Sequence, residues 1–341
     1  MTRWLDRVAG AWQRYFFDPR PATDLGVSRV LFFTLAFAYY LPQDFSEWGT
    51  VSPELWMPTT LFRIFALPAL PAAVIHGIQI VFKTALALAA IGLATRIAMP
   101  VACACAFYLL GLPQNFGQIQ HFDTLVVLVC AILAVSRAGD AWSVDGWLAD
   151  RRGRSPVAPS GEYTWPIRAI WVMTAVIFFA AGFSKLRHSG LRWIFSDHLA
   201  IVLVRHQYFV SDGDPLTTWG PAIAAHPWAA RLMAAIAVGT ELFYPLTLVS
   251  ARARLIFVPA GIAFLIGIRM LMGPTFEPFV MCSVFWVPWS AVLTRVRTAV
   301  EARRARQSVA RSVIDAELAA SPTAATLSRA AISTPSKSSP P

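Results

Sequence analysis

Long apolar runs separated by short polar stretches recur along the chain and restrict its fold more than any other feature. A helix that crosses a bilayer needs about 20 predominantly apolar residues. Hydrophobic residues make up 56% of the 341 residues and charged residues only 14%. This composition lies outside the soluble globular range and excludes a large water-soluble catalytic domain. Spans are expected at approximately residues 25–41, 74–94, 98–112, 122–135, 167–183, 228–249, 255–271 and 276–293.

These runs predict an all-α fold, a polytopic membrane helix bundle of about eight transmembrane helices. Several runs are shorter than a full span, but flanking Trp, Tyr and Arg side chains can extend such helices to the interface. Residues 198–209 are too short to cross a bilayer and have charged groups on both sides. They predict a re-entrant or interfacial helix between the fifth and sixth spans.

Arginine is concentrated in alternate connections, namely before the first run, between the second and third, and after the fourth, sixth and eighth. Because cytoplasmic loops carry an excess of Lys and Arg, we expect a multi-pass plasma-membrane protein with both termini cytoplasmic. Residues 1–24 are then an N-terminal cytoplasmic segment, residues 25–294 a transmembrane domain, and residues 295–341 a basic, largely disordered cytoplasmic tail.

The net charge of +10 does not indicate a nucleic-acid partner, because much of the excess lies in the tail. A basic stretch directly after a span binds the anionic cytoplasmic face of the bilayer, so the expected partner is lipid and no nucleic acid is expected. The cysteines form neither a disulfide framework nor a C-x-x-C pair, and we expect small core hydrophobes and no metal site. They are Cys103, Cys105, Cys130 and Cys282.

Ionisable residues gather at the predicted outer ends of three spans. His121 and Asp123 open the fourth span, Lys185 and His188 close the fifth, and Arg269 lies near the outer end of the seventh. Such groups are costly near hydrocarbon and need a partner or a purpose, and their spread over three helices is typical of a site built between helices. The alternative is that the Lys185 and His188 side chains extend to lipid headgroups.

Two charged residues lie deep inside apolar runs, Lys83 in IVFKTAL and Glu241 in AVGTELFYP. Because a buried carboxylate must be protonated or paired, we expect a structural Lys83–Glu241 ion pair. The alternative is that Lys83 faces lipid. Lysine is otherwise rare, with Lys185 and Lys337 the only others among 29 basic side chains. A desolvated lysine can act as a base, whereas arginine cannot give up its proton.

Several motifs resemble one known family. Lys185 lies in AAGFSKL, before a tryptophan-containing stretch at 191–195 and RHQYF at 205–209. WSVDG at 142–146, Asp18-Pro19 with DLGVSRVLFF at 24–33, and His121 follow the same pattern. Together they resemble the membrane domain of vitamin K-dependent gamma-carboxylase, within the wider group of HTTM-type membrane domains, over roughly residues 15–295.

The resemblance implies a mechanism and a set of roles. Lys185 deprotonates reduced vitamin K or another quinone, oxygen addition yields a stronger base and finally an epoxide, and that base removes the gamma proton of an extracytoplasmic peptide glutamate before CO2 adds. His121 stabilises the reacting oxygen. We expect the cofactor-binding residues to be His188, Arg269 and Asp123, and the structural residues to be Lys83, Glu241, Trp142 and Asp145.

The chain also departs from this family. Arg269 stands in GIRML where the family commonly has a histidine, and we expect no counterpart within residues 25–341 of the soluble lumenal portion of the animal carboxylases. Homologous folds host different activities. The competing function is a non-enzymatic membrane module that binds a lipid or a partner protein. A transporter would need polar groups at mid-membrane on several spans, and only Lys83 and Glu241 fit.

Overall fold

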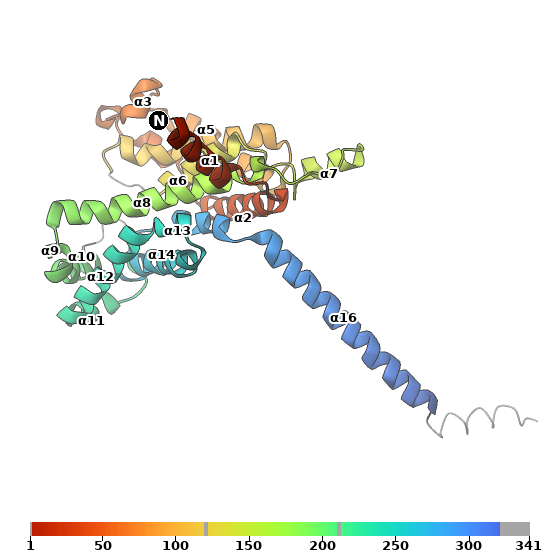
Figure 1. The fold of residues 1–341 in the computed structure, drawn as a ribbon. Coiled ribbons are helices and arrows are strands. Elements are labelled where there is room, and N and C mark those ends of the chain that lie inside the picture. Colours follow the sequence, from red (N-terminus) through yellow and green to blue (C-terminus); the bar gives the residue numbers. More distant parts are fainter. Residues whose placement is uncertain (1, 119–121, 210–212, 321–341) are drawn as a thin grey trace, which may run out of the picture. The chain divides into compact units, whose positions relative to one another are not determined.

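The computed structural model describes residues 2–118, 122–209 and 213–320, and every regular element in these ranges is a helix (Figure 1). The longer α-helices are α1 (Thr2–Phe17), α2 (Ala22–Tyr40), α4 (Ala72–Ile91), α5 (Thr95–Asn115), α6 (Thr124–Ala134), α8 (Trp165–Ser189), α10 (His198–Tyr208), α12 (Pro227–Phe243), α14 (Ala251–Leu271) and α16 (Trp289–Ala320). Short helices connect them: α3 (Thr60–Ile64), α7 (Val144–Arg151), α9 (Arg192–Phe195), α11 (Trp219–Ala224), α13 (Leu246–Val249), α15 (Glu277–Met281) and the 3-10 turns η1 (Ser46–Thr50), η2 (Pro53–Leu55), η3 (Gly161–Tyr163) and η4 (Cys282–Trp286).

Five helical stretches of the described chain are long and apolar enough to cross a membrane: α2, α4, α5, η3 with α8, and α14. The protein is therefore an integral, multi-pass membrane protein with an all-α fold, as predicted. The short helix expected at 198–209 is present as α10. The structure divides into two units, residues 1–288 with helices α1 to α15, and residues 289–341 with the long basic helix α16.

Three predicted spans differ from straight membrane helices. The fourth is α6, which has only 11 residues. The sixth is interrupted at Tyr244-Pro245 and becomes α12 and α13, because proline lacks the N–H that continues a helix. The eighth begins as α15 and η4, and the first unit ends at Pro288. The total of eight spans stays a prediction.

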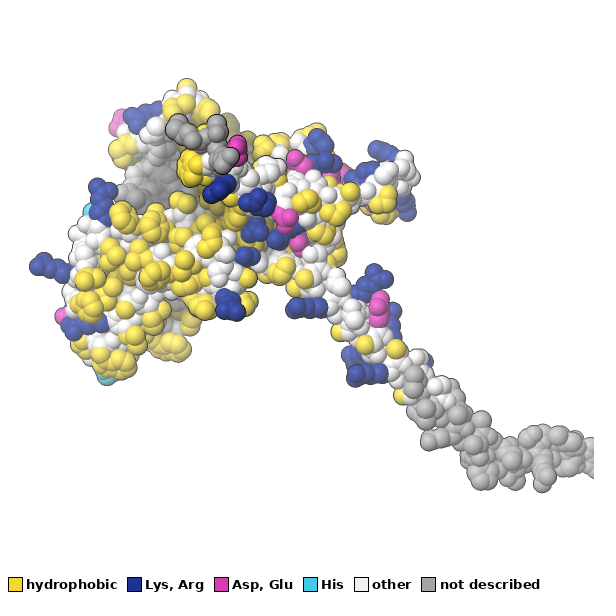
Figure 2. Space-filling model, in the orientation of Figure 1, with side chains coloured by type: hydrophobic (Ala, Val, Ile, Leu, Met, Phe, Trp, Pro, Cys, Tyr) yellow, Lys and Arg dark blue, Asp and Glu magenta, His cyan; other side chains and the backbone are white. Residues whose placement is uncertain are grey.

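The first unit is held together by consecutive helix packing. Helix α2 packs on α4, α4 on α5, α5 on α6, and α8 on α12. Phe32, Phe33, Phe82 and Phe285 are almost completely buried in one core. Hydrophobic side chains also cover the outer face over α8 and α12 to α14 (Figure 2). Exposed apolar surface of this extent indicates contact with lipid.

Arg29 joins three segments that are distant in sequence. It is fully buried in α2 and donates hydrogen bonds to the carbonyl oxygens of Ala89, at 2.7 Å, and of Trp142. The last carbonyl groups of a helix have no partner within it and carry partial negative charge. The end of α4 and the loop before α7 therefore accept hydrogen bonds from both terminal nitrogens of the guanidinium group. The motif residues Arg29 and Trp142 thus meet beside the α4–α5 turn.

Candidate functional site

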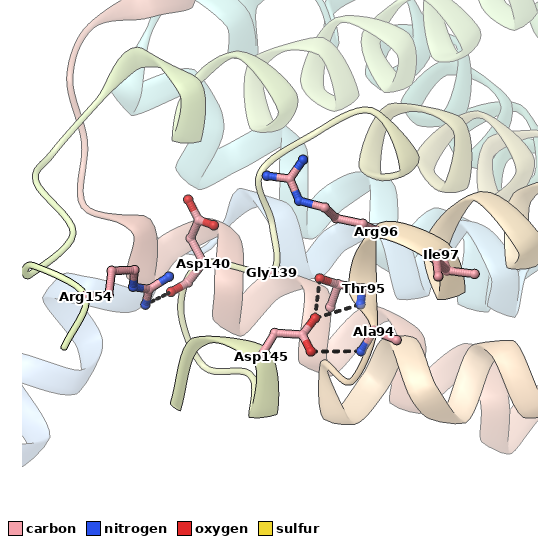
Figure 3. Close-up of a pocket in the computed structure, with 8 residues that line it drawn as sticks. All are labelled: Ala94, Thr95, Arg96, Ile97, Gly139, Asp140, Asp145 and Arg154. Atoms are coloured by element: carbon pink, nitrogen blue, oxygen red, sulfur yellow. Dashed lines mark hydrogen bonds between the residues drawn. The ribbon is translucent and has the colours of Figure 1, made fainter. Parts of the chain in front are cut away.

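A hollow of about 290 Å³ lies where the α4–α5 turn meets the loop before α7 (Figure 3). Asp145 extends into this region from α7. Its carboxylate accepts hydrogen bonds from the backbone N–H of Ala94 at 2.8 Å and from the N–H and hydroxyl groups of Thr95, both at 2.7 Å. Arg154 donates to the carbonyl oxygen of Asp140 on the opposite side.

Asp145 caps helix α5 from another part of the chain. Burial acts to raise the pKa of Asp145, but the hydrogen bonds from Thr95 and Ala94 outweigh it and hold this pKa below its ordinary value. Both carboxylate oxygens already have partners within the fold. Asp145 of the WSVDG motif therefore stabilises the α4–α5 turn. We call this contact the Asp145 brace, and we assign the residues around the hollow to structure rather than to a reaction site.

A second cavity, of about 140 Å³, contains a partly buried ion pair. Its walls come from α8, α12, α14 and the start of α15, and eight of its ten lining residues are apolar. The two exceptions are Lys185 and Glu241. The cavity is lined by Ile177, Phe178, Ala181, Lys185, Glu241, Phe264, Leu265, Ile268, Phe276 and Phe279.

Lys185 and Glu241 form this pair directly, Nζ to Oε1. The Glu241 side chain is only 3% exposed, while that of Lys185 is 23% exposed. The ammonium nitrogen also lies 5.2 Å from the ring centre of Trp193 in α9 and 5.9 Å from that of Phe264, within cation–π range. The second oxygen of Glu241, Oε2, is buried without a hydrogen-bond partner among the described residues.

Gly182 allows the pair to form. A Cβ atom at this position would lie 2.8 Å from the Cβ of Glu241 and 3.1 Å from the backbone nitrogen of Leu242. Only glycine permits α8 and α12 to approach this closely. Lys185 lies one turn farther along α8, so its side chain meets the carboxylate where the two helices touch.

The expected Lys83–Glu241 pair is wrong. Lys83 Nζ donates to the carbonyl oxygen of Gln43 at 2.7 Å, and Glu241 binds Lys185 instead. The prediction assumed that Lys83 and Glu241 both lie near the middle of a straight span. Helix α12 instead ends at Phe243, so Glu241 lies close to a helix end.

Comparison with known protein families shows the family of this chain. A family model described as the HTTM domain matches residues 17–289. The chain belongs to the HTTM family. Comparison with curated proteins and with solved structures gave no match. The HTTM match includes the Lys185–Glu241 cavity, Arg29 and the Asp145 brace.

Two predicted cofactor-binding residues of this HTTM domain do not line the cavity. His188 is exposed, and its Nδ1 lies 2.8 Å from the carbonyl oxygen of Ser184 on its own helix. Arg269 binds Glu277 at 3.2 Å and donates to the carbonyl groups of Asp214 and Gly273. Arg269 therefore links the end of α14 to neighbouring loops.

The third predicted cofactor-binding residue, Asp123, is also absent from the cavity lining. Asp123 accepts a hydrogen bond from the buried hydroxyl group of Tyr40. Its neighbour Phe122 contacts Phe276, with ring centres 4.8 Å apart, and Phe276 lines the cavity. His121, the predicted partner of Lys185 in catalysis, lies outside the described residues. No group of three His, Cys, Asp or Glu side chains suited to a metal occurs in the described part.

The sequence analysis missed the roles of two charged residues of this HTTM domain. Glu241 was assigned to structure alone, although its carboxylate lines the cavity beside Lys185. Arg29 was not singled out, although it is a charged residue inside the first apolar run. The rule that an intramembrane charge needs a partner applies to both, and would have found Arg29.

Proposed function

We propose that this HTTM protein is a membrane enzyme in which Lys185, paired with Glu241, deprotonates a reduced quinone; the resemblance to the vitamin K-dependent carboxylases implies this step for Lys185. One observation supports this most. An amine and a carboxylate share an apolar cavity, and one carboxylate oxygen has no partner among the described residues.

The residues present fit a hydroxyl-bearing aromatic ring. Glu241 Oε2 is a buried acceptor that needs a donor, and the walls of Phe178, Phe264, Phe276 and Phe279 suit an apolar ring. The cavity of about 140 Å³ is smaller than the roughly 300–1,000 Å³ typical of ligand sites. Only the head of a lipid-soluble molecule would enter, and its chain would remain among lipids.

The proton chemistry follows from the pair itself. Burial disfavours separated charges, so the ammonium group of Lys185 can pass a proton to Glu241 and leave a neutral amine beside a neutral acid. The amine can then accept a proton from a hydroxyl group. The pair would change from net neutral to net positive on taking that proton, and the Lys185 ammonium group would then hold its charge beside the oxygen that gave the proton.

When bound, a reduced quinone supplies the acidic hydroxyl group and the electrons for the reaction with oxygen. The apolar walls exclude water, which would otherwise protonate a strong base before a peptide glutamate could. Lys185 lies near the end of α8, which the arginine pattern predicts to be extracytoplasmic. A peptide substrate would approach there, and His121 remains the proposed donor to the reacting oxygen.

The decisive experiment measures epoxide formation. Purified protein in lipid nanodiscs is supplied with vitamin K hydroquinone and oxygen, and the epoxide is quantified by chromatography. We expect turnover by the wild type, loss in Lys185→Ala, and retention in the matched control Lys83→Ala, because Lys83 is bonded to the Gln43 carbonyl outside the cavity. Thermal unfolding checks that all three proteins are folded.

The competing function is a non-catalytic lipid-binding module in which the pair only fastens α8 to α12. Its support is the same ion pair, which already satisfies one charge with another. A folded wild type that forms no epoxide, but binds the hydroquinone equally well with or without Lys185, would favour this module and contradict the enzyme.

A further inference from the structure

Three arginines converge at the end of the bundle where α8 and α14 begin. Arg168 lies in the first turn of α8, Arg254 in the first turn of α14, and Arg20 in the loop between α1 and α2. Arg20 lies near enough to both of the others for their positive charges to repel. Such a grouping is unfavourable unless a negative charge offsets it.

The backbone fixes Arg20 in this place. Its N–H donates to the carbonyl oxygen of Ser160 at 3.2 Å, and the Ser160 N–H donates back at 3.0 Å. The hydroxyl group of Thr164 binds the carbonyl oxygen of Asp18. The loop after α1 is thereby fastened to the segment that leads into α8.

One indole ring organises the other two arginines. The guanidinium carbons of Arg168 and Arg254 lie 4.4 and 4.8 Å from the ring centre of Trp171. Trp171 is buried, stacks on Trp286 with ring centres 4.6 Å apart, and donates to the carbonyl oxygen of Phe285. Two cationic groups are therefore held on a rigid platform rather than extended freely into water.

Within the described ranges, none of Arg20, Arg168 and Arg254 forms an ion pair with an Asp or Glu. Arg168 lies over Tyr15, with its guanidinium carbon 4.7 Å from the ring centre. The Tyr15 hydroxyl group faces the Arg168 guanidinium group, and the Nε of Arg254 is buried without a hydrogen-bond partner among the described residues. Leaving buried polar atoms unsatisfied is costly.

We propose that Tyr15, Arg20, Arg168 and Arg254 form a binding site for a phosphate group. A phosphate offers several oxygens in a tetrahedral arrangement, so it can accept from more than one guanidinium group and from a hydroxyl group together. The arginine pattern predicts that this end of the bundle is cytoplasmic, where anionic lipid headgroups lie. The phosphate can belong to a phospholipid or to a soluble anion, and the two sources are separable.

The test compares two probes on full-length protein in neutral detergent at fixed ionic strength. Native mass spectrometry measures the affinity for phosphatidylglycerol, with phosphatidylcholine as the reference lipid, and thermal unfolding measures protection by inorganic phosphate. Arg168→Gln and Arg254→Gln are compared with Arg252→Gln, an exposed arginine on the same turn of α14 that loses the same charge.

We expect each site variant to weaken phosphatidylglycerol binding about fivefold and Arg252→Gln to leave it unchanged. If the same pattern occurs with inorganic phosphate but not with the lipid, the site binds a soluble phosphate. The proposal is overturned if the site variants and Arg252→Gln behave alike toward both probes, or if wild-type protein binds phosphatidylglycerol no better than phosphatidylcholine and gains no protection from phosphate.

Discussion

Removing both partners of the Lys185–Glu241 pair should cost less stability than the sum of the two single removals. Glu241→Gln leaves an ammonium group beside an apolar cavity without its counter-charge. Breaking a fully buried pair in this way typically costs about 3–5 kcal/mol. Because the Lys185 side chain is 23% exposed and retains some access to a polar environment, we expect a loss of about 2–3 kcal/mol.

A double-mutant cycle separates this pairing from a general loss of packing. Lys185→Met combined with Glu241→Gln should recover about 1–2 kcal/mol relative to the sum of the single changes, because no charge then stays unpaired. Lys83→Met provides the matched control, since Lys83 binds the Gln43 carbonyl rather than Glu241. Its effect should add to that of Glu241→Gln within about 0.5 kcal/mol.

The measurement is reversible unfolding of the purified protein in mixed micelles, followed by circular dichroism against the mole fraction of denaturing detergent. The coupling energy between Lys185→Met and Glu241→Gln is compared with that between Lys83→Met and Glu241→Gln. Equal coupling for Lys83 and Lys185, or none for Lys185, would show that the ion pair does not form in solution and would remove the basis of the proposed base.

Three further substitutions test the rest of the architecture by the same unfolding assay. Asp145→Asn should cost about 2 kcal/mol at neutral pH, because it weakens charge-assisted hydrogen bonds to Thr95 and Ala94. The folded pKa of Asp145 is lowered, so its contribution is complete above the ordinary value of 3.8 and is lost as the pH falls through the lower folded value. The gap between wild type and Asp145→Asn should close there, and a gap that persists in acid would contradict this account. Arg29→Met should cost about 3 kcal/mol through the carbonyl groups it leaves unsatisfied, and a neutral result would show that lipid or water can replace its bonds. Gly182→Ala should cost about 1–3 kcal/mol by pushing α8 from α12, whereas Gly239→Ala, whose Cβ meets open space, should cost little; equal losses would refute the close contact.

Much of the fold follows from apolar length alone. The runs at 25–41, 74–94, 98–112, 167–183 and 255–271 became α2, α4, α5, α8 and α14, with each helix end within six residues of the prediction. Length and hydropathy are sufficient there because a bilayer leaves a helix as the only way to satisfy the backbone.

Interruptions were harder to predict than spans. Pro245 breaks the sixth run and Pro288 ends the first unit, but both lie in sequences as apolar as their surroundings. A proline can kink a membrane helix or end it, and neighbouring helices decide which. The apolar runs at 228–249 and 276–293 were therefore each predicted as one span, whereas the structure divides each of them into separate helices.

The site was predictable by residue but not by pairing. Lys185 and Glu241 were both singled out as costly charges, yet the partner of Glu241 depended on where α12 stops. The small residue in GFSKL was the available signal, since Gly182 marks the place where another helix approaches α8. His188 lies three residues after Lys185 on the same helix, but its ring nitrogen pairs with the carbonyl oxygen of Ser184, so closeness along a helix did not place both side chains in one cavity.

The bonds of Arg29 also constrain the order in which the protein can be assembled. Its acceptors Ala89 and Trp142 lie 60 and 113 residues farther along the chain, so α2 leaves the ribosome long before either exists. A lone arginine at the centre of an inserting helix costs about 2.5–3.5 kcal/mol, and less nearer an end. The bonds that bury the Arg29 guanidinium group in α2 can therefore form only after residue 142 has been synthesised.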